Sequence, residues 1–149
     1  MIPKFRCFDK NAKTMHEVVA IDFKDWRVYY EAYGLRSYWN KNVVLMQSTG
    51  LHDNTKFEDL SEKEQVEWLE SGKSADEWQG REVFEGDIVK IVYDGEPFTG
   101  VVVYDLGEAD FKATNGHEDY GNNFQYLTVG ESIEVIGNIY ENPELLEDV

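Results

Sequence analysis

Residues Gly86–Tyr104 read GDIVKIVYDGEPFTGVVVY, two runs rich in β-branched side chains on either side of an Asp-Gly turn. Such runs around the turn residues Asp94–Pro97 predict a β-hairpin. Further short apolar runs, spaced by glycine and asparagine, follow at Phe111–Thr114, Phe124–Thr128 and Ile133–Tyr140. About five short strands in fewer than 60 residues predict a small SH3-like β-barrel over residues 80–149.

The alternation within these strands also predicts which side chains form the core of the barrel. The expected inward-facing residues are Ile88, Val101, Val103, Ile136 and Ile139. Gly137 interrupts the last strand, and a glycine within a strand often marks a bulge or a close backbone approach.

The N-terminal part of the chain, residues 1–56, predicts a second β region. Lys4–Phe8 alternates charged and apolar side chains, and Met15–Phe23 follows after a polar turn, so the two runs predict a hairpin. Val43–Gln47 predicts another short strand. The stretch Trp26–Trp39 is dense in aromatic residues, and its periodicity fits a long strand or a short helix equally well.

The clearest helix in the sequence is Leu60–Glu70. Ser61 and Glu64 have the spacing of a capping box, and Gly72 is placed to end the helix. Its apolar face is narrow, which indicates a helix that lies on another part of the protein rather than in a core. The whole chain is therefore expected to be mainly β, in the β-rich α+β class. Its expected parts are residues 1–56, a helical segment at 57–79, and residues 80–149 with an acidic tail.

Composition limits the classes of protein to consider. The chain has 149 residues, of which 42% are hydrophobic and 14% aromatic, a composition that favours a folded domain. It has a single cysteine, Cys7, so no internal disulfide framework is possible. No run approaches the roughly 20 apolar residues of a membrane span, and the N-terminus lacks the features of a signal peptide. These features predict a cytoplasmic protein that does not bind membranes.

Charge is distributed unevenly along the chain, which carries a net charge of -16. Residues 1–42 hold 8 basic and 5 acidic side chains, whereas residues 43–149 hold 6 basic and 25 acidic ones. A strong negative field disfavours nucleic acid and anionic membranes as partners. It serves solubility, or it attracts a basic partner.

Four sequence strings, in this order, resemble the YopX family of small proteins encoded by phages and prophages. They are KFRCFD at residues 4–9, MQSTGL at 46–51, EGDIVK at 85–90 and EVIGNIYENPELL at 134–146. The resemblance implies a phage origin, a β-rich fold and a tendency to self-associate. It implies no catalytic mechanism.

One feature departs from the family pattern. Leu51 and Glu85 are separated by 33 residues, whereas about a dozen residues of turn usually join these strings in the family. The excess coincides with the predicted helix. Residues 57–79 are therefore expected to be a separable helical insertion.

Several side chains were considered for chemistry, and each also has a structural interpretation. His16, His52 and His117 are far apart and lack the spacing of metal ligands, and Cys7 is expected to be buried and inert. Asp87 precedes a strand, where a carboxylate usually accepts backbone hydrogen bonds. The carboxylates of Asp105–Asp110 suggest Ca²⁺ only weakly, since the spacing is not that of an EF-hand. No cofactor or metal site is predicted.

The sequence thus favours a non-enzymatic, self-associating interaction protein that binds an unidentified protein partner. One version of this hypothesis is a basic partner that is bound by nucleic-acid mimicry. An alternative is a nucleic-acid-binding module that stacks bases on its basic, aromatic N-terminal region. A weaker third hypothesis is a metal-dependent hydrolase or nuclease that uses Asp87 and the carboxylates of residues 105–110. The candidate partner or oligomer contacts are Trp26, Tyr29, Tyr30, Tyr33, Arg36, Tyr38 and Trp39.

Overall fold

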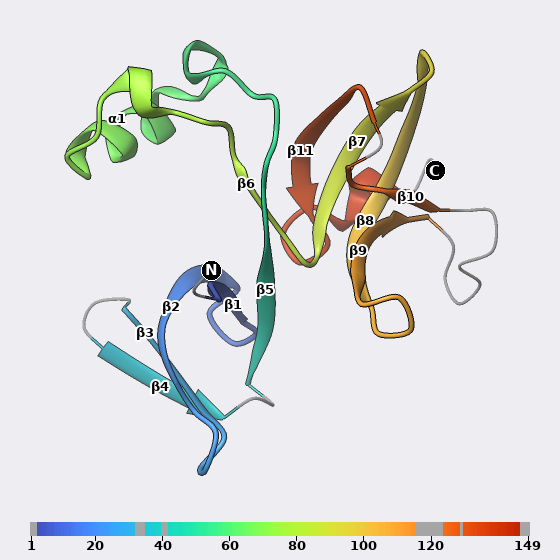
Figure 1. Ribbon diagram of the computed structural model, residues 1–149. Coiled ribbons are helices and arrows are strands. Elements are labelled where there is room, and N and C mark those ends of the chain that lie inside the picture. Colours follow the sequence, from blue (N-terminus) through green and yellow to red (C-terminus); the bar gives the residue numbers. More distant parts are fainter. Residues whose placement is uncertain (1–2, 32–34, 40–41, 116–123, 129, 147–149) are drawn as a thin grey trace.

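The computed structural model contains two antiparallel β-sheets and one short α-helix, which confirms the mainly β class (Figure 1). It describes residues 3–31, 35–39, 42–115, 124–128 and 130–146. In Figure 1 the strands β1 to β4 lie on one side of the long strand β5 and the second sheet lies on the other, and the helix α1 lies at one end of β5 and β6.

The first sheet is formed by the N-terminal region together with one short later strand. Its order is β4-β3-β2-β1-β5-β6, with every neighbouring pair antiparallel. The hairpin of the first two strands is as predicted, and the aromatic stretch forms two paired strands rather than one strand or a helix. The strands are β1 (Phe5–Asp9), β2 (Thr14–Asp22), β3 (Arg27–Glu31), β4 (Leu35–Trp39), β5 (Val43–His52) and β6 (Glu82–Phe84).

The second sheet has the order β10-β9-β8-β7-β11. Its first hairpin turns through Asp94 and Gly95, with φ angles of 50° and 77°, the conformation that the Asp-Gly sequence predicts. The strands are β7 (Asp87–Tyr93), β8 (Glu96–Asp105), β9 (Asp110–Thr114), β10 (Phe124–Tyr126) and β11 (Ser132–Asn138).

The prediction of a closed barrel is not confirmed. Among the described residues no pairing joins β10 to β11, so hydrogen bonds do not close this sheet on itself. The free edge of β11 is occupied by a different segment. Asn54 donates its N–H to the carbonyl of Ile133 at 2.9 Å, and its side-chain oxygen accepts from the N–H of Ile133 at 2.7 Å.

The core of this sheet differs from the predicted set. Ile88 is fully buried as expected, but the buried valine of β8 is Val102 rather than Val101 or Val103. Ile136 is 36% exposed. The pairing of β11 with β7 shifts register between Val135 and Gly137, which is the bulge that the glycine predicted, and the shift leaves Ile136 without a paired position.

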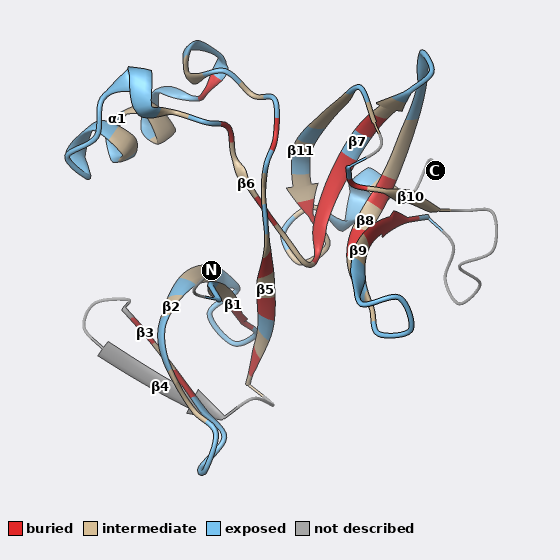
Figure 2. Ribbon diagram, in the orientation of Figure 1, coloured by how far each residue is buried: buried red, intermediate tan, exposed pale blue. Residues whose placement is uncertain are grey.

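The core cluster therefore comes from the opposite face of β8 to the one expected. Its buried members are Val83, Val89, Ile91, Val102, Ala113 and Leu127, and Ile139 is only partly buried and lies outside it. A smaller cluster in the first sheet is formed by Cys7, Val28, Tyr30 and Val43. Figure 2 shows buried residues along β5, β7 and β9.

The helix α1 (Glu62–Glu70) has the predicted capping box. The Ser61 side chain accepts from the N–H of Glu64 at 3.2 Å, and the Glu64 carboxylate accepts from the N–H of Ser61 at 3.4 Å. Gly72, with φ at 89°, follows the helix. None of the residues of α1 is buried (Figure 2). The single-turn 3-10 helices are η1 (Phe57–Asp59), η2 (Ala75–Glu77) and η3 (Pro143–Leu146).

Side-chain contacts of β1 connect the two sheets. Arg6 of β1 donates to the carboxylate of Asp87 in β7 at 2.6 Å, and its guanidinium lies 4.7 Å from the ring centroid of Phe84. Phe8 stacks on Tyr140, with ring centroids 5.2 Å apart. Ion pairing and aromatic packing therefore hold β1 against the start of the second sheet.

Candidate interaction site

The aromatic stretch that the sequence singled out is only partly available for contacts. Trp26 lies in the turn between β2 and β3 and is 59% exposed, and Tyr29 is partly exposed. Tyr30 is 1% exposed, which corrects its assignment as a surface contact. Its hydroxyl donates to Asp9 Oδ2 at 2.6 Å, and its ring stacks on His16 at 4.3 Å.

The remaining candidates of this stretch cannot be placed as side chains. Tyr33 lies outside the described residues. The backbone of Arg36, Tyr38 and Trp39 forms β4 and pairs with β3, while their side chains lie outside the description.

Exposed apolar side chains that the sequence did not single out lie on β2 and just after it. Val19 of β2 is 54% exposed, and Phe23, just after β2, is 70% exposed. A groove of about 430 Å³ runs along β2 and is lined mainly by apolar residues, Val19 and Phe23 among them. We call Val19, Phe23 and Trp26 the β2 surface. Alternation in the sequence places Val19 and Phe23 in a hairpin strand, but it does not show that their side chains are exposed.

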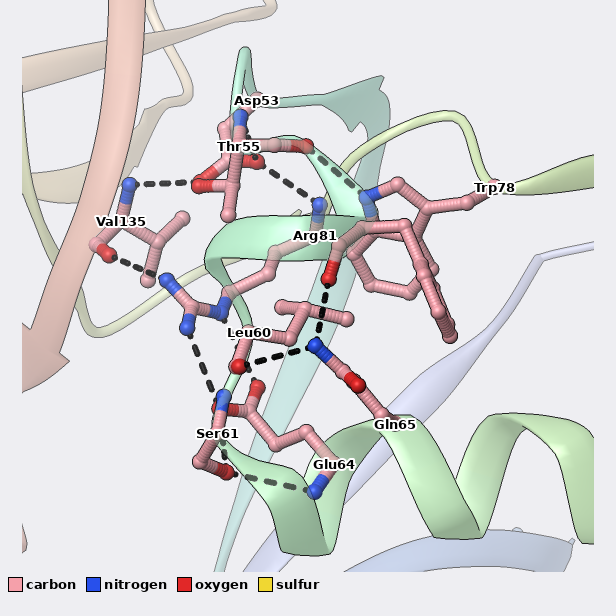
Figure 3. Close-up of polar contacts among 10 residues, drawn as sticks. Asp53, Thr55, Leu60, Ser61, Glu64, Gln65, Trp78, Arg81 and Val135 are labelled. Carbon is pink, nitrogen blue, oxygen red and sulfur yellow. Dashed lines mark hydrogen bonds and ion pairs between the residues drawn. The ribbon is translucent and has the colours of Figure 1, made fainter. Parts of the chain in front are cut away.

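The helical segment is anchored at its base by Asp53 (Figure 3). Asp53 is 3% exposed, and its carboxylate accepts from the N–H groups of Thr55 at 3.0 Å, Arg81 at 2.7 Å and Val135 at 2.9 Å. The N–H of Asp53 in turn donates to the carbonyl of Arg81 at 2.8 Å. This carboxylate therefore joins the two ends of the helical segment to the edge of β11.

Arg81 extends the same network toward α1. Its guanidinium donates to both carboxylate oxygens of Glu64, at 3.1 and 3.2 Å, and to the carbonyl of Val135 at 3.3 Å. The hydrogen bonds from Arg81 lower the pKa of Glu64, and the same contacts raise the pKa of Arg81. The neighbouring Gly80 has φ at 108°, and a Cβ there would lie 1.9 Å from the carbonyl oxygen of Asp53. The base of the segment thus requires glycine at this position.

The residues considered for catalysis or metal binding have structural partners. Asp87 accepts from Arg6 and from the N–H of Phe84 at 2.8 Å, the structural role that the sequence favoured, and burial raises its pKa. Cys7 is fully buried, and burial raises its pKa to about 12, so the thiol is unreactive at neutral pH.

The carboxylates of the β8–β9 turn surround a lysine. Lys112 is 2% exposed and donates to Asp105 at 2.8 Å, with Glu108 at 3.2 Å. Its ammonium also lies 4.3 Å from the ring centroid of Phe124 and 5.2 Å from that of Tyr126. These carboxylates thus serve as counter-ions for a buried lysine.

The histidines are not brought together. His16 bonds Thr14 at 2.6 Å, His52 is exposed at the end of β5, and His117 lies outside the described residues. In the described part of the chain, no three His, Cys, Asp or Glu side chains are grouped as metal ligands. No helix in that part is long and apolar enough to cross a membrane.

These features define a β-rich protein of two sheets whose helical segment is fastened to a sheet edge. The family model described as YopX protein matches residues 72–147, about half of the chain. The chain therefore belongs to the YopX family. The match begins inside the segment expected to be an insertion, and it includes Arg81 and Val135 but not Asp53.

A similar solved structure is the X-ray crystal structure of protein yopX from Bacillus subtilis. The two chains share 23% sequence identity and superpose with a TM-score of 0.57, over 97% of this chain and 98% of the other. This likeness supports the two-sheet fold over nearly the whole chain. A comparison of the sequence with curated proteins found no match.

Proposed function

We propose that this protein is a non-enzymatic interaction protein that self-associates through the β2 surface and presents its acidic parts to a basic protein partner. The exposure of Phe23, 70% on a surface with no covering layer among the described residues, is the observation that carries this proposal. Exposed apolar patches of this kind commonly mark protein–protein contacts. Val19 and Trp26, at 54% and 59% exposed, are the other members of the β2 surface.

Charge supports the same assignment. The N-terminal region that contains the β2 surface is basic, whereas residues 43–149 are strongly acidic. A contact between the basic region of one copy and the acidic region of another would pair unlike charges and fix their orientation. We further propose a phage or prophage origin and a cytoplasmic location.

The order of the strands in the C-terminal sheet is compatible with an SH3-like fold. Four strands follow one another as a meander, and β11 returns to the free side of β7. We propose that this sheet is a variant of the SH3-like fold in which Asp53 and Asn54, rather than a neighbouring strand, cover the edge of β11.

Replacing Phe23 tests the self-association surface. We expect Phe23→Ser to raise the dissociation constant of the oligomer about tenfold to a hundredfold, the effect of losing about 1.5–3 kcal/mol of buried apolar surface. Sedimentation equilibrium measures it. Leu106→Ser is the matched control, because Leu106 is 86% exposed in a turn of the other sheet. Equal assembly of both variants and the unmodified protein would contradict the proposal.

Nucleic-acid binding by the aromatic stretch is the alternative function. Tyr30 is buried and unavailable for stacking on bases, which weakens that alternative. Titration with single-stranded and duplex DNA at low and high salt separates the two, since phosphate contacts weaken steeply with salt.

A further inference from the structure

A groove of about 520 Å³ lies between the helical segment and the strands β5 and β6. Trp68 and Trp78 contribute two aromatic walls, with ring centroids 5.0 Å apart and planes at 88°. Both indole N–H groups are engaged, Trp68 with the carbonyl of Ser74 at 2.7 Å and Trp78 with that of Thr55 at 2.8 Å. The exposed ring surfaces therefore offer π faces rather than hydrogen-bond donors.

The chain places one of its own cations on this aromatic wall. The ammonium of Lys73 lies 4.5 Å from the ring centroid of Trp68, within the range of a cation–π contact. Lys73 itself is exposed and lies beyond the end of α1. Because the Lys73 side chain is exposed, another cation can displace it. Its position indicates that the face of Trp68 accepts a cation.

The groove is also lined by a carboxylate with few donors, that of Glu82. Glu82 Oε1 lies 3.4 Å from the ammonium of Lys4, but Glu82 Oε2 is buried and has no hydrogen-bond partner among the described residues. Buried polar atoms are normally paired. The Glu82 side chain as a whole is 22% exposed, so its under-paired carboxylate is partly open to the groove.

The charges of the groove favour a cationic ligand once Lys73 is displaced. Lys4 and Lys73 balance Glu77 and Glu82 among the lining residues, so removing the Lys73 ammonium leaves a net negative charge. The net charge of -16 on the chain adds a field that attracts cations from solution.

We propose that this groove binds a basic side chain, foremost an arginine, of a partner polypeptide. The guanidinium replaces the Lys73 ammonium on Trp68 and pairs with the partly exposed carboxylate of Glu82. Arginine fits better than lysine, because its planar guanidinium stacks on an aromatic ring while its edge donates hydrogen bonds. This inference rests on the proposed function, in that it locates where a basic partner is recognised.

A labelled pentapeptide with one arginine tests the inference, and the same peptide with uncharged citrulline is its control. We expect fluorescence anisotropy to detect binding of the arginine peptide only. Lys73→Gln should tighten that binding about twofold to fivefold, the range of an exposed cation–π contact. Lys63→Gln, which removes an exposed lysine of α1 outside the groove, should leave it unchanged.

Glu82→Gln should weaken binding of the arginine peptide at least about fivefold. Should this variant unfold, the comparison of Lys73→Gln with Lys63→Gln decides on its own. The inference is overturned if Lys73→Gln binds no arginine peptide at millimolar concentration, if both lysine variants behave alike, or if the groove variants change affinity only for a single-stranded DNA probe. Self-association measured on Phe23→Ser is independent of these results, so failure of the proposed function is recognised separately.

Discussion

Buried carboxylates fix the backbone at several points in this protein. Asp9, Asp53 and Asp87 are each 3% exposed or less, and each accepts at least two hydrogen bonds from neighbouring groups. The sequence predicted this role for Asp87 alone, because a carboxylate at a strand entry is a local pattern. Asp53 bonds to Arg81 and Val135, which are distant in sequence, and no local pattern reveals such a contact.

The acid sensitivity of folding should depend on Asp9. Burial alone would raise the pKa of Asp9, but hydrogen bonds from Tyr30, Ala12 and Asn11 outweigh it and lower that pKa below its ordinary value of 3.8. The resulting stability is present above pH 3.8 and is lost as the pH falls through the lower pKa of the folded state.

Asp9→Asn should therefore destabilise the protein by about 1–3 kcal/mol at pH 7. It should also flatten the loss of stability as the pH falls below 3.8, where the Asp9 contribution is lost. Urea unfolding at several pH values measures both effects. Asp25→Asn, in an exposed turn of the same sheet, is the control and should change neither; an unaltered acid response in Asp9→Asn would contradict the role of Asp9.

At the scale of elements, features that depend on adjacent residues were predictable from the sequence, whereas contacts between distant residues were not. The Asp-Gly hairpin, the capping box and the bulge at Gly137 follow from adjacent residues, and all three are present. The side chains displaced by the bulge were not predictable, because a one-residue shift moves side chains to the other face. The edge of β11 is covered by Asn54, about 80 residues away, so the sequence favoured a closed barrel.

Substitutions of two isoleucines in the second sheet test which residues form its core. Ile91 is fully buried, whereas Ile136 is 36% exposed beside the bulge. Ile91→Ala should lower the free energy of unfolding by about 2–5 kcal/mol, and Ile136→Ala by less than about 1 kcal/mol. Denaturant unfolding compares the two directly. A larger loss for Ile136→Ala would restore the simple alternation and contradict the observed register.

The helical segment should be separable from the sheets. Its base is held by Asp53, Arg81 and Val135, all outside residues 57–79, and within that segment Leu60 alone is buried, at 6% exposed. Joining Lys56 to Gly80 through a short turn should leave a cooperatively folding protein, since shortening a loop changes its closure entropy little.

Two substitutions compare the base of the segment with its helix. Asp53→Ala should cost about 1–3 kcal/mol because it leaves buried N–H groups without an acceptor, whereas Glu64→Gln should cost about 1 kcal/mol or less, as for a partly exposed ion pair. Thermal and urea unfolding measure all three variants. Loss of cooperative unfolding in the deletion would show that the segment belongs to the core.

At the scale of the whole molecule, the charge distribution and the exposed apolar side chains both favour the β2 surface as the contact for self-association. The β2 surface lies in the basic part of the chain, and the acidic remainder includes the groove with Trp68 and Trp78. The sequence predicted the charge asymmetry and an aromatic contact region. It did not identify Phe23, because exposure depends on which sheet face is left uncovered.

Sedimentation equilibrium of the unmodified protein at low and high salt tests the central claim of self-association most directly. We predict an oligomer, at least a dimer, whose contacts weaken as salt rises, because screening over about 8–10 Å at 0.1–0.15 M salt acts on pairs of unlike charge. Association that tightens with salt would retain assembly but attribute it to apolar contact alone. A monomer at every concentration up to about ten times a micromolar dissociation constant would contradict the claim.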